Sequence, residues 1–322
     1  MSKWLALATA GVLAFGVAAC GDDSSDSSAS GGSGGGDLSG AVKIDGSSTV
    51  GPFAQTAAEQ FQGENPNVQI SVGTSGTGGG FEKFCAGETD ISDASRPIKE
   101  DEEAPICKKN GVTYQEITVA NDGIAVVTNK DLKIDCMTTA QLKQLWNTGS
   151  KITNYSQIDP KFPDVEVSLY GPGTDSGTFD FFTDEINGEE GVSRKEYQPS
   201  EDDNILVQGV SGDEGGLGYF GFSYYEQNQD ELNLVGVDGG DGCVKPSVEA
   251  IQDGSYTPLS RPIFMYPSEQ SIGQKPQVKG FMEYTIDNAE EIATASQIVP
   301  LTAAQVDKAK GQLKEAEANA VK

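Results

Sequence analysis

Apolar and polar residues follow two patterns that alternate along the chain. Short runs are apolar throughout or alternate with polar residues, as β-strands do, and longer runs carry apolar residues three and four positions apart, as helices do. Val50, Phe53, Ala57 and Phe61 share one helical face, for example, and Gly63 follows them as a helix end. The strand pattern occurs at residues 41–44, 68–72, 89–92, 117–121, 124–128, 165–170 and 263–266.

The helix pattern fills most of the gaps between the predicted strands. One helix is predicted to start at Phe81, and another spans residues 138–149 with a threonine as its cap. Further helices are predicted at 279–284 and 305–318, and residues 216–227 predict a tight turn, a buried strand and the start of a helix. This alternation predicts an α/β protein in which helices cover mostly parallel sheets.

The first 20 residues have the pattern of an export signal. Lys3 precedes an uncharged apolar run at 4–19, which is short for a membrane-spanning helix but suits a signal peptide. The run ends in Val-Ala-Ala-Cys-Gly at 17–21, which resembles a bacterial lipobox, so Cys20 is the predicted lipidation site. A plain secretory signal with an incidental cysteine is the alternative.

Residues 21–40 predict a flexible tether, because the Gly/Ser/Asp tract at 21–36 has nothing to bury. A lipid anchor followed by a tether predicts a domain held at the outer side of the cytoplasmic membrane, in the periplasm or outside the cell. Later stretches of the sequence are not long and apolar enough to cross a bilayer.

Charge and composition exclude several classes of function. Of the 322 residues, 49 are acidic and 22 are basic, which gives a formal net charge of −27. Such a surface repels a nucleic-acid backbone, so we expect no nucleic-acid partner. The chain has no histidine, which excludes Ser–His and Cys–His nucleophile pairs and removes the commonest metal ligand. We therefore expect a protein that is not an enzyme and that holds neither a metal nor another cofactor.

Three turns rich in Gly, Ser and Thr carry the most informative chemistry. They lie at 45–53, 73–81 and 171–179, and each follows a predicted strand and precedes a predicted helix. A helix N-terminus leaves backbone N–H groups free, glycine lets the backbone approach a ligand, and hydroxyl groups add donors. One such turn is an ordinary helix cap. Three that face a single crevice form a cage for a small oxyanion.

Arginine occurs only at positions 96, 194 and 261. Arg96 follows a predicted strand beside Ser95, where a guanidinium can reach the crevice and hold two oxygen atoms at once; a surface ion pair is the alternative. Arg194 lies in a charged stretch and is predicted to be on the surface. Arg261 precedes a proline and a strand, and is predicted to contact a hinge.

With these residues in view, the chain resembles the phosphate-binding lipoproteins that feed bacterial phosphate ABC importers. Besides the three turns, the resemblance rests on the sequences at 90–98, 138–158 and 216–225. It covers essentially the whole chain after the tether. It implies a two-lobed periplasmic solute-binding fold in which each lobe is a mixed sheet flanked by helices. Two strands cross between the lobes, and phosphate binds in the cleft.

The resemblance also implies which residues bind phosphate. Thr49 and Val50 match the contacts of the first turn, through a hydroxyl and a backbone N–H respectively, and the second and third turns match further contacts. The complete predicted set is Ser47, Ser48, Thr49, Val50, Ser75, Gly76, Thr77, Gly78, Ser95, Arg96, Asp175, Ser176, Gly177 and Thr178.

The chain departs from the family at two positions of the site. Many members place an arginine shortly before the Ser-Gly-Thr of the third turn, but here residues 171–173 are Gly-Pro-Gly, so Arg96 is the predicted clamp. Many members also place an aspartate at the position of Ser95, where it accepts the proton of hydrogen phosphate and disfavours sulfate. The other candidate acceptors are Asp93, Asp45, Asp175, Glu201, Asp202 and Asp203.

The implied fold divides the chain after the tether into two lobes. Residues 41–122 and 262–322 are assigned to lobe I and residues 123–261 to lobe II. The cysteines other than Cys20 allow three pairings, and the choice of Cys85–Cys107 with Cys136–Cys243 keeps each disulfide within one lobe. Zinc binding is the alternative, but the spacing lacks a Cys-x-x-Cys pair.

The resemblance implies a monomer that binds inorganic phosphate, closes around it and docks on the permease of an ABC importer. A binder of sulfate, molybdate or an organic anion, and a tethered sensor or adhesin, are the alternatives. The sequence Asp-Ser-Gly-Thr at 175–178 matches the local signature of an aspartic protease, but no second Asp-Ser/Thr-Gly occurs. A phosphatase needs a nucleophile, usually with metals, and the sequence offers no clear metal cluster.

Overall fold

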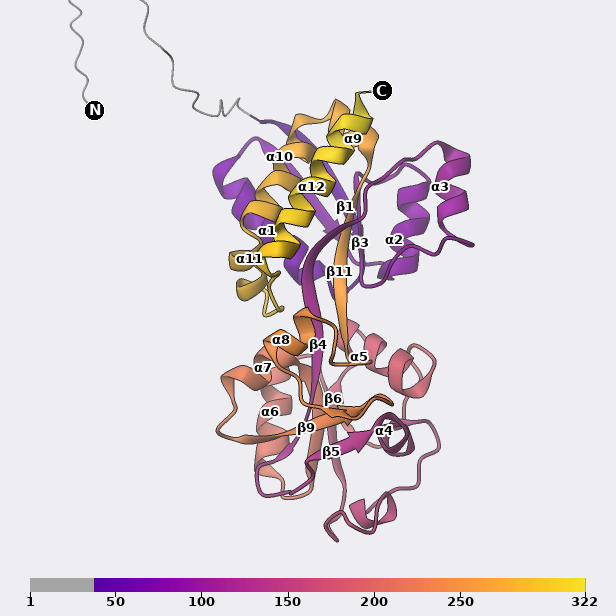
Figure 1. The fold of residues 1–322 in the computed structure, drawn as a ribbon, viewed down its shortest axis with the longest axis vertical. Helices are drawn as coiled ribbons and strands as arrows, with labels where there is room; N and C mark the ends of the chain where they lie inside the picture. Colours follow the sequence, from indigo (N-terminus) through magenta and orange to yellow (C-terminus); the bar gives the residue numbers. More distant parts are fainter. Residues whose placement is uncertain (1–37, 322) are drawn as a thin grey trace, which may run out of the picture. The chain divides into compact units, whose positions relative to one another are not determined.

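The structure is a computed structural model in which residues 38–321 are described. These residues form two lobes, and two strands run from one lobe into the other (Figure 1). The predicted signal segment, the lipidation site Cys20 and residues 21–37 of the predicted tether lie outside the described residues. Among residues 38–321, no helix combines the length and the apolar character that a membrane crossing requires.

Lobe I is built from two separate parts of the chain. Its elements are β1 (Gly40–Gly46), α1 (Gly51–Glu64), β2 (Val68–Gly73), α2 (Gly76–Cys85), β3 (Ile91–Ala94), α3 (Ala104–Asn110), the first half of β4 (Ile117–Asn129), β11 (Ser260–Pro267), α9 (Glu269–Gln274), α10 (Pro276–Asp287), α11 (Ala289–Ala295) and α12 (Ala303–Ala320). The strand order is β2-β1-β3-β11-β4. The outer strands pair in parallel, whereas β11 is antiparallel to both of its neighbours.

Helices cover both faces of the sheet of lobe I. α1, α10 and α12 lie on one face, where Phe53 and Phe281 belong to a fully buried apolar cluster. α2 and α3 lie on the other face, where Phe81 and Tyr266 meet edge to face with ring centres 4.9 Å apart. A disulfide joins Cys85 at the end of α2 to Cys107 in α3, which confirms the predicted pairing.

Lobe II follows β4 along the chain. Its elements are the second half of β4, β5 (Cys136–Thr138), α4 (Thr139–Trp146), η1 (Tyr155–Gln157), β6 (Ser168–Pro172), α5 (Gly177–Phe182), the π-helical turn η2 (Thr183–Asn187), β7 (Gln198–Ser200), α6 (Asp203–Gly212), β8 (Gly216–Gly221), α7 (Phe222–Gln227), β9 (Leu232–Asp238), β10 (Cys243–Val244) and α8 (Val248–Gln252). The strands β4, β8, β6 and β7 are neighbours in that order, and β9 pairs with β4, β5 and β10.

An aromatic cluster holds α4 and α5 against the sheet of lobe II. The rings of Phe182 and Tyr219 stack with their centres 3.7 Å apart, and the ring of Trp146 meets Tyr219 edge to face at 4.8 Å. The second predicted disulfide, Cys136–Cys243, is also present and joins β5 to β10. The predicted α/β fold and both cysteine pairings are therefore confirmed.

The strand β4 belongs to both lobes. Residues 117–123 of this strand pair with β11, and residues 124–129 pair with β8 and β9. In the register with β11, Arg261 lies opposite Asp122 and Ser260 lies opposite Gly123. β4 and β11 are thus the two crossing strands that the resemblance implied, and the residues at their contact lie between the lobes.

The structure differs from the predicted elements at several boundaries. α2 begins at Gly76, five residues before the predicted Phe81, because the glycine-rich stretch is itself the first part of the helix. β6 begins at Ser168 and not at 165, because Val165 and Val167 exchange backbone hydrogen bonds with the loop at 153–155. The helix α4 has the predicted threonine cap, since Thr138 and Gln141 satisfy each other's backbone N–H groups.

Candidate functional site

A cleft of about 530 Å³ lies between the lobes, and parts of all three Gly-, Ser- and Thr-rich turns line it. Lobe I supplies the end of β1, the start of α2 and the residues that follow β3. Lobe II supplies α5 and η2, and the crossing strand β11 supplies one wall. The lining residues are Ser47, Ser48, Thr49, Ser75, Gly76, Thr77, Gly78, Gly79, Ser95, Arg96, Pro97, Gly177, Asp180, Phe181, Asp184, Glu185, Glu190, Ser260, Arg261 and Pro262.

The first turn connects β1 to α1. Ser47 is almost fully buried, its hydroxyl accepts a hydrogen bond from the N–H of Thr49 at 3.2 Å, and its own N–H donates to Asp93 O at 3.0 Å. Val50 does not line the cleft, because its side chain is fully buried in the apolar cluster under α1. Its backbone N–H is therefore the only part of Val50 that can serve a ligand.

The second turn becomes the start of α2. Gly76 has a φ of +79°, which glycine adopts without strain. Ser75 donates from its backbone N–H and its hydroxyl to Asp45, and Thr77 Oγ1 lies 3.0 Å from Ser95 Oγ. The hydroxyl groups on this side of the cleft are thus held in fixed positions by their neighbours.

The third turn meets the first turn across the cleft. Ser176 caps α5 by accepting a hydrogen bond from the N–H of Thr178 at 3.2 Å. A Cβ atom added at Gly177 would lie 2.3 Å from Thr49 Oγ1 and 2.7 Å from Ser48 Oγ. Only glycine allows the two lobes to approach this closely at this point.

The remaining residues of the third turn face a second opening between the lobes. This groove has a volume of about 490 Å³. Its lining includes Asp175, Ser176 and Thr178 from the third turn, while Ser48, Thr49 and Gly177 are shared with the first cleft. Of the predicted ligand residues, only Val50 lines neither space.

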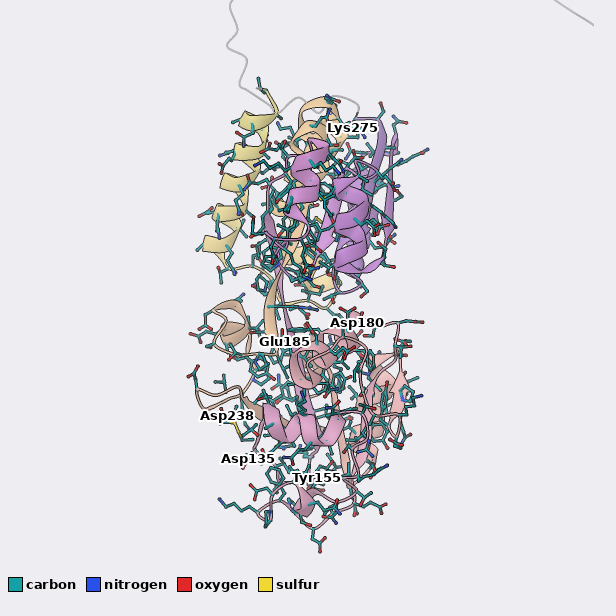
Figure 2. All side chains as sticks on the ribbon, turned by 90° about the vertical axis from the view of Figure 1, so that its right-hand side faces the viewer. Asp135, Tyr155, Asp180, Glu185, Asp238 and Lys275 are labelled. Atoms are coloured by element: carbon teal, nitrogen blue, oxygen red, sulfur yellow. A yellow bond between two sulfur atoms is a disulfide. The ribbon has the colours of Figure 1, made fainter. Side chains whose placement is uncertain are left out.

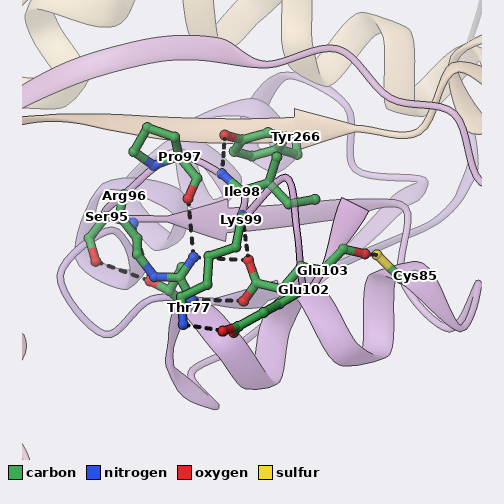
Figure 3. A network of polar contacts seen from close by, with 10 residues as sticks. All are labelled: Thr77, Cys85, Ser95, Arg96, Pro97, Ile98, Lys99, Glu102, Glu103 and Tyr266. Carbon is green, nitrogen blue, oxygen red and sulfur yellow. Dashed lines mark hydrogen bonds and ion pairs between the residues drawn. The ribbon is translucent and has the colours of Figure 1, made fainter. Parts of the chain in front are cut away.

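Arg96 lines the cleft, but its guanidinium already has a partner. It donates to both carboxylate oxygens of Glu103, at 2.9 and 2.7 Å, and also to Pro97 O (Figure 3). This hydrogen bonding to Glu103 raises the pKa of Arg96. Thr77 and Ser95 lie beside the guanidinium in the same network, so Glu103 fixes Arg96 at the edge of the turn-built cage.

Arg261 is the basic residue that the sequence analysis placed only at the hinge. It lies in β11, and its Nη2 donates to Thr49 Oγ1 at 2.9 Å. Its Nε donates to Asp122 at 3.3 Å, and its guanidinium carbon lies 3.6 Å from the ring centre of Phe181 in α5. Arg261 therefore touches the first turn, the other crossing strand and lobe II at once. Its alternation with Ile263 and Met265 along the strand is the signal that places its side chain on the face of α1.

Arg194 is buried, although the charged stretch around it predicted a position on the surface. Its side chain is 8% exposed, and its Nη1 donates to the backbone carbonyl oxygens of Leu145 and Ile152 at 3.2 Å each. These carbonyls come from a part of lobe II more than 40 residues earlier in the chain. Arg194 is a structural residue of lobe II, and it does not line the cleft.

The candidate proton acceptors differ sharply in their surroundings. Burial raises the pKa of Asp45, but hydrogen bonds from Lys83 and Ser75 outweigh it, and the net shift is downward. Lys83 Nζ lies 2.6 Å from Asp45 Oδ2, so this carboxylate already forms an ion pair. Asp93 is fully buried in β3, and neither of its carboxyl oxygens has a hydrogen-bond partner among the described residues. Burial, with a smaller contribution from Asp45, raises the pKa of Asp93 to about 8.

Lobe II adds a wall of carboxylates that the sequence analysis did not single out. Asp180, Asp184, Glu185 and Glu190 line the cleft, and Figure 2 shows Asp180 and Glu185 at the end of lobe II that faces lobe I. Burial and the nearby Glu190 raise the pKa of Asp180 to about 6, although Arg261 opposes this shift. Asp180 is thus ionised at neutral pH and lies two residues after Thr178 of the third turn.

The arrangement suits the binding of a small oxyanion. Hydroxyl groups, helix N-termini and two guanidinium groups converge, and each is a hydrogen-bond donor. Among residues 38–321, no group of three or more His, Cys, Asp or Glu side chains is arranged to hold a metal ion.

Comparison with known proteins agrees with this geometry. The model of the PBP superfamily domain matches residues 27–289. Protein SphX of Synechococcus elongatus is 46% identical over 265 residues, which cover 81% of this chain and 78% of the relative. The phosphate-binding protein PstS of Staphylococcus saprophyticus is 38% identical over 304 residues, covering 94% of this chain and 91% of the relative.

Solved structures extend the similarity to the fold. The crystal structure of a possible phosphate-binding protein from Planctomyces limnophilus superposes with a TM-score of 0.82 at 39% identity and covers 87% of this chain and 99% of its own. A putative phosphate ABC transporter substrate-binding protein from Clostridium perfringens, solved with bound phosphate, superposes with a TM-score of 0.57 at 27% identity, over 82% of this chain and 100% of its own. The chain belongs to the PBP superfamily and, within it, to the family of PstS-type solute-binding proteins.

Proposed function

We propose that this protein binds inorganic phosphate between its two lobes. The observation that carries the proposal is the meeting of Thr49, Gly177 and Arg261, which brings donors of lobe I, lobe II and the hinge strand to one point. These local donors can hold an anion although the chain is strongly acidic, because salt screens charges that lie more than about 10 Å away. The names of the PstS relatives and the phosphate in the Clostridium perfringens structure support the same ligand.

Each part of the cage has its own proposed role toward phosphate. Ser47, Ser48, Thr49 and the N–H of Val50 contact it from the first turn. Residues 75–78 contact it from the second turn, Gly177 contacts it from the third turn, and Ser95 adds a hydroxyl beside them. Asp175, Ser176 and Thr178 line the adjoining groove and stay candidate contacts from the third turn. Arg261 takes the place of the arginine that many relatives carry before the third turn, and Arg96 acts as a second, outer guanidinium.

Asp180 is our candidate for the carboxylate that accepts the proton of hydrogen phosphate. It lines the cleft, and with a pKa of about 6 it is ionised at neutral pH. Asp45 is excluded from this role by its ion pair with Lys83. Because sulfate brings no proton at neutral pH, an ionised carboxylate at this position repels sulfate and accepts hydrogen phosphate.

We further propose that the protein works as a monomer outside the cytoplasm, anchored by a lipid on Cys20 and reaching out on the tether that precedes β1. Gly40, the last residue of the predicted tether, is already the first residue of that strand. Lobe I then comprises 41–122 and 262–322, and lobe II comprises 123–261. Phosphate shifts the population toward a form in which the lobes close around it, and this closed form docks on the permease of an ABC importer.

Titration calorimetry with phosphate, arsenate, sulfate and molybdate tests the ligand. We expect tight binding of phosphate and arsenate and little heat from sulfate or molybdate. A stronger response to one of the latter would identify the protein as a binder of another oxyanion. Release of phosphate from a generic phosphate ester would contradict the assignment as a binding protein without enzymatic activity.

Two further measurements test the transport role. Small-angle scattering is expected to report a more compact molecule when phosphate is added, and an unchanged radius of gyration would contradict closure. Deleting the gene is expected to lower phosphate uptake by the cells. Unchanged uptake together with phosphate binding would indicate a tethered sensor and not a transport component.

A further inference from the structure

The helix α11 of lobe I ends in a hydrogen-bonding pattern that normally requires glycine. The N–H of Ile298 donates to Ala293 O at 2.9 Å, and the N–H of Gln297 donates to Thr294 O at 3.2 Å. This pair of bonds is the Schellman motif, in which the residue after the helix cap adopts the left-handed conformation. The residue in that position is Gln297, with a φ of +58°.

Gln297 is an exception within this chain. Ten other residues of the described range 38–321 have a clearly positive φ, and all of them are glycine. The end of α2 shows the usual solution, because there the same two hydrogen bonds are made around Gly87, by Gly87 N to Phe84 O and by Glu88 N to Lys83 O. A side chain at a left-handed position is strained, so glutamine at 297 is disfavoured by the local backbone.

Gln297 is one of the residues that line the second groove between the lobes. Gln297 lines this groove of about 490 Å³ on the lobe I side, and Glu201, Asp203 and Tyr224 line it on the lobe II side. Among residues 38–321, the side-chain amide of Gln297 makes no hydrogen bond, although the residue is partly buried.

The other hydroxyl groups next to Gln297 on this wall are already used. Thr56 Oγ1 donates to Pro52 O at 2.8 Å, and Ser296 Oγ donates to Ile292 O at 2.6 Å. Among the described residues, the amide of Gln297 is therefore a donor without a partner, in a groove that Glu201 and Asp203 also line. A neutral amide is also the kind of group that can approach those carboxylates without repulsion or the burial of a second charge.

Asp203 is the best acceptor on the opposite wall. It lies at the start of α6 and accepts a hydrogen bond from the backbone N–H of Gly221. Burial, with smaller contributions from Asp202 and Glu201, raises the pKa of Asp203 to about 6. A further hydrogen-bond donor favours the ionised form of this carboxylate.

We propose that Gln297 is a positioning residue for the closed state, in which its side-chain amide crosses the groove and donates a hydrogen bond to the Asp203 carboxylate of lobe II. This inference rests on the proposed binding of phosphate and on closure of the lobes around it. The hydrogen bond forms in the closed, phosphate-bound state only and stabilises that state. It therefore slows the release of phosphate and leaves the rate of phosphate capture unchanged. The strain at residue 297 is the cost of placing an amide there.

The inference predicts that one substitution changes stability and binding in opposite directions. In the mature chain, Gln297→Gly is expected to raise the melting temperature without phosphate by about 2–4 °C, because the strain at the helix end is removed. The same variant is expected to lose about three- to tenfold in phosphate affinity, entirely through faster dissociation in stopped-flow measurements. Gln297→Ala is expected to show the same loss of affinity without the gain in stability.

A matched control separates the helix end from the groove. A Cβ atom at Gly87 meets nothing within 4 Å, and Gly87 is the corresponding residue of α2. Gly87→Ala is expected to lower the melting temperature, because it places a side chain in the left-handed position, and to leave the phosphate dissociation rate unchanged. The effect of Gln297→Ala on dissociation is expected to disappear when Asp203 is replaced by alanine, since the acceptor is then absent.

Three results bear on the inference in different ways. If Gln297→Gly is more stable but releases phosphate at the wild-type rate, the inference is wrong while phosphate binding stands. If Gln297→Ala has its full effect in the Asp203→Ala background, Asp203 is not the acceptor and the proposal as stated is overturned. If the wild-type protein does not bind phosphate at all, the proposed function itself fails, and this outcome is recognised before any variant is made.

Discussion

Arg261 Nη2 donates a hydrogen bond to Thr49 Oγ1 at 2.9 Å, although the two residues are 212 positions apart in the chain. The bond joins the crossing strand β11 to the turn that begins α1. The same guanidinium is held by Asp122 of the second crossing strand and lies over the ring of Phe181 in lobe II. Arg261 is therefore the charged residue through which the hinge, both lobes and the anion cage are in direct contact.

Replacing Arg261 is expected to weaken phosphate binding more than any other single change of charge. Arg261→Lys keeps the charge but loses the forked geometry, and should cost about tenfold in affinity, whereas Arg261→Gln should cost about a hundredfold. Calorimetry measures both. As a control, Lys310→Gln removes an exposed cation from α12 and should leave the phosphate affinity unchanged. If Arg261→Gln binds phosphate as tightly as the wild type does, Arg261 is not part of the site.

Arg96 is expected to contribute from the outer edge of the cage. Arg96→Ala should weaken phosphate binding by at least about tenfold, because it removes a charge-assisted donor from the cleft. Glu103→Gln should have a smaller effect of about threefold, because it loosens the guanidinium without removing it. Calorimetric titration of both variants beside wild type measures this, and unchanged affinity for Arg96→Ala would mean that Arg96 serves only as the partner of Glu103.

Asp93 is expected to make stability depend on pH in an unusual direction. Its pKa is about 8 in the folded protein and close to 3.8 in the unfolded chain, so between these values the folded state holds a proton that the unfolded state has lost. The stability that this proton contributes is fully present below pH 4, falls as the pH rises, and is gone above pH 8. The slope is up to about 1.4 kcal/mol per pH unit.

The variant Asp93→Asn isolates this effect, because asparagine has nearly the same shape and no titrating proton. Urea unfolding of both proteins between pH 4.5 and 8.5 should give a stability difference that moves steadily in favour of Asp93→Asn as the pH rises. All other titrating groups are common to both proteins and cancel in the difference. A constant difference over this range would mean that Asp93 is ionised in the folded state.

Removing the two disulfides is expected to have separable consequences. The bridge Cys136–Cys243 closes a loop of 107 residues, and its removal by paired alanine substitutions should lower the free energy of unfolding by about 3–5 kcal/mol without changing phosphate affinity. The bridge Cys85–Cys107 closes only 22 residues and should cost about 2–3 kcal/mol, but it also ties α2 to α3. Because α2 carries Thr77, and Glu103, the partner of Arg96, directly precedes α3, this second variant should also bind phosphate less tightly.

Much of the site is readable from the sequence because its chemistry is local. Each Gly-, Ser- and Thr-rich turn stands between a strand and a helix, and such a turn presents its donors wherever the fold places it. Thr49 follows β1 of lobe I and Gly177 follows β6 of lobe II, so each of these turns lies at the carboxyl end of a strand, as ligand-binding turns of α/β folds do. The two disulfides follow in the same way once the lobes are assigned.

The arginines show where sequence reasoning ends. Arg194 lies in a charged stretch, but it reaches carbonyl groups of lobe II that are far away in sequence. Arg261 precedes a proline and an apolar strand, and it reaches Thr49, which is also far away in sequence. Alternation along β11 indicates the face of the sheet on which Arg261 lies. The acceptor that a long cationic side chain reaches depends on strand register and on residues that are distant in the sequence. The boundary of α2 differs for a related reason, since this glycine-rich helix packs against strands β1 and β3, and the local sequence does not show that packing.

The position of β11 in the middle of its sheet constrains the order in which the molecule can be completed. This strand, at 260–267, lies between β3 and β4, whereas the sheet of lobe II uses only strands that end by residue 244. A chain that stops short of residue 260 can therefore still pair every strand of lobe II, but it leaves facing edges of β3 and β4 without partners. A chain that lacks β11 should accordingly expose unpaired edges of β3 and β4 in lobe I, and such edges promote aggregation. The sheet of lobe I can be completed only after the last quarter of the polypeptide has been synthesised.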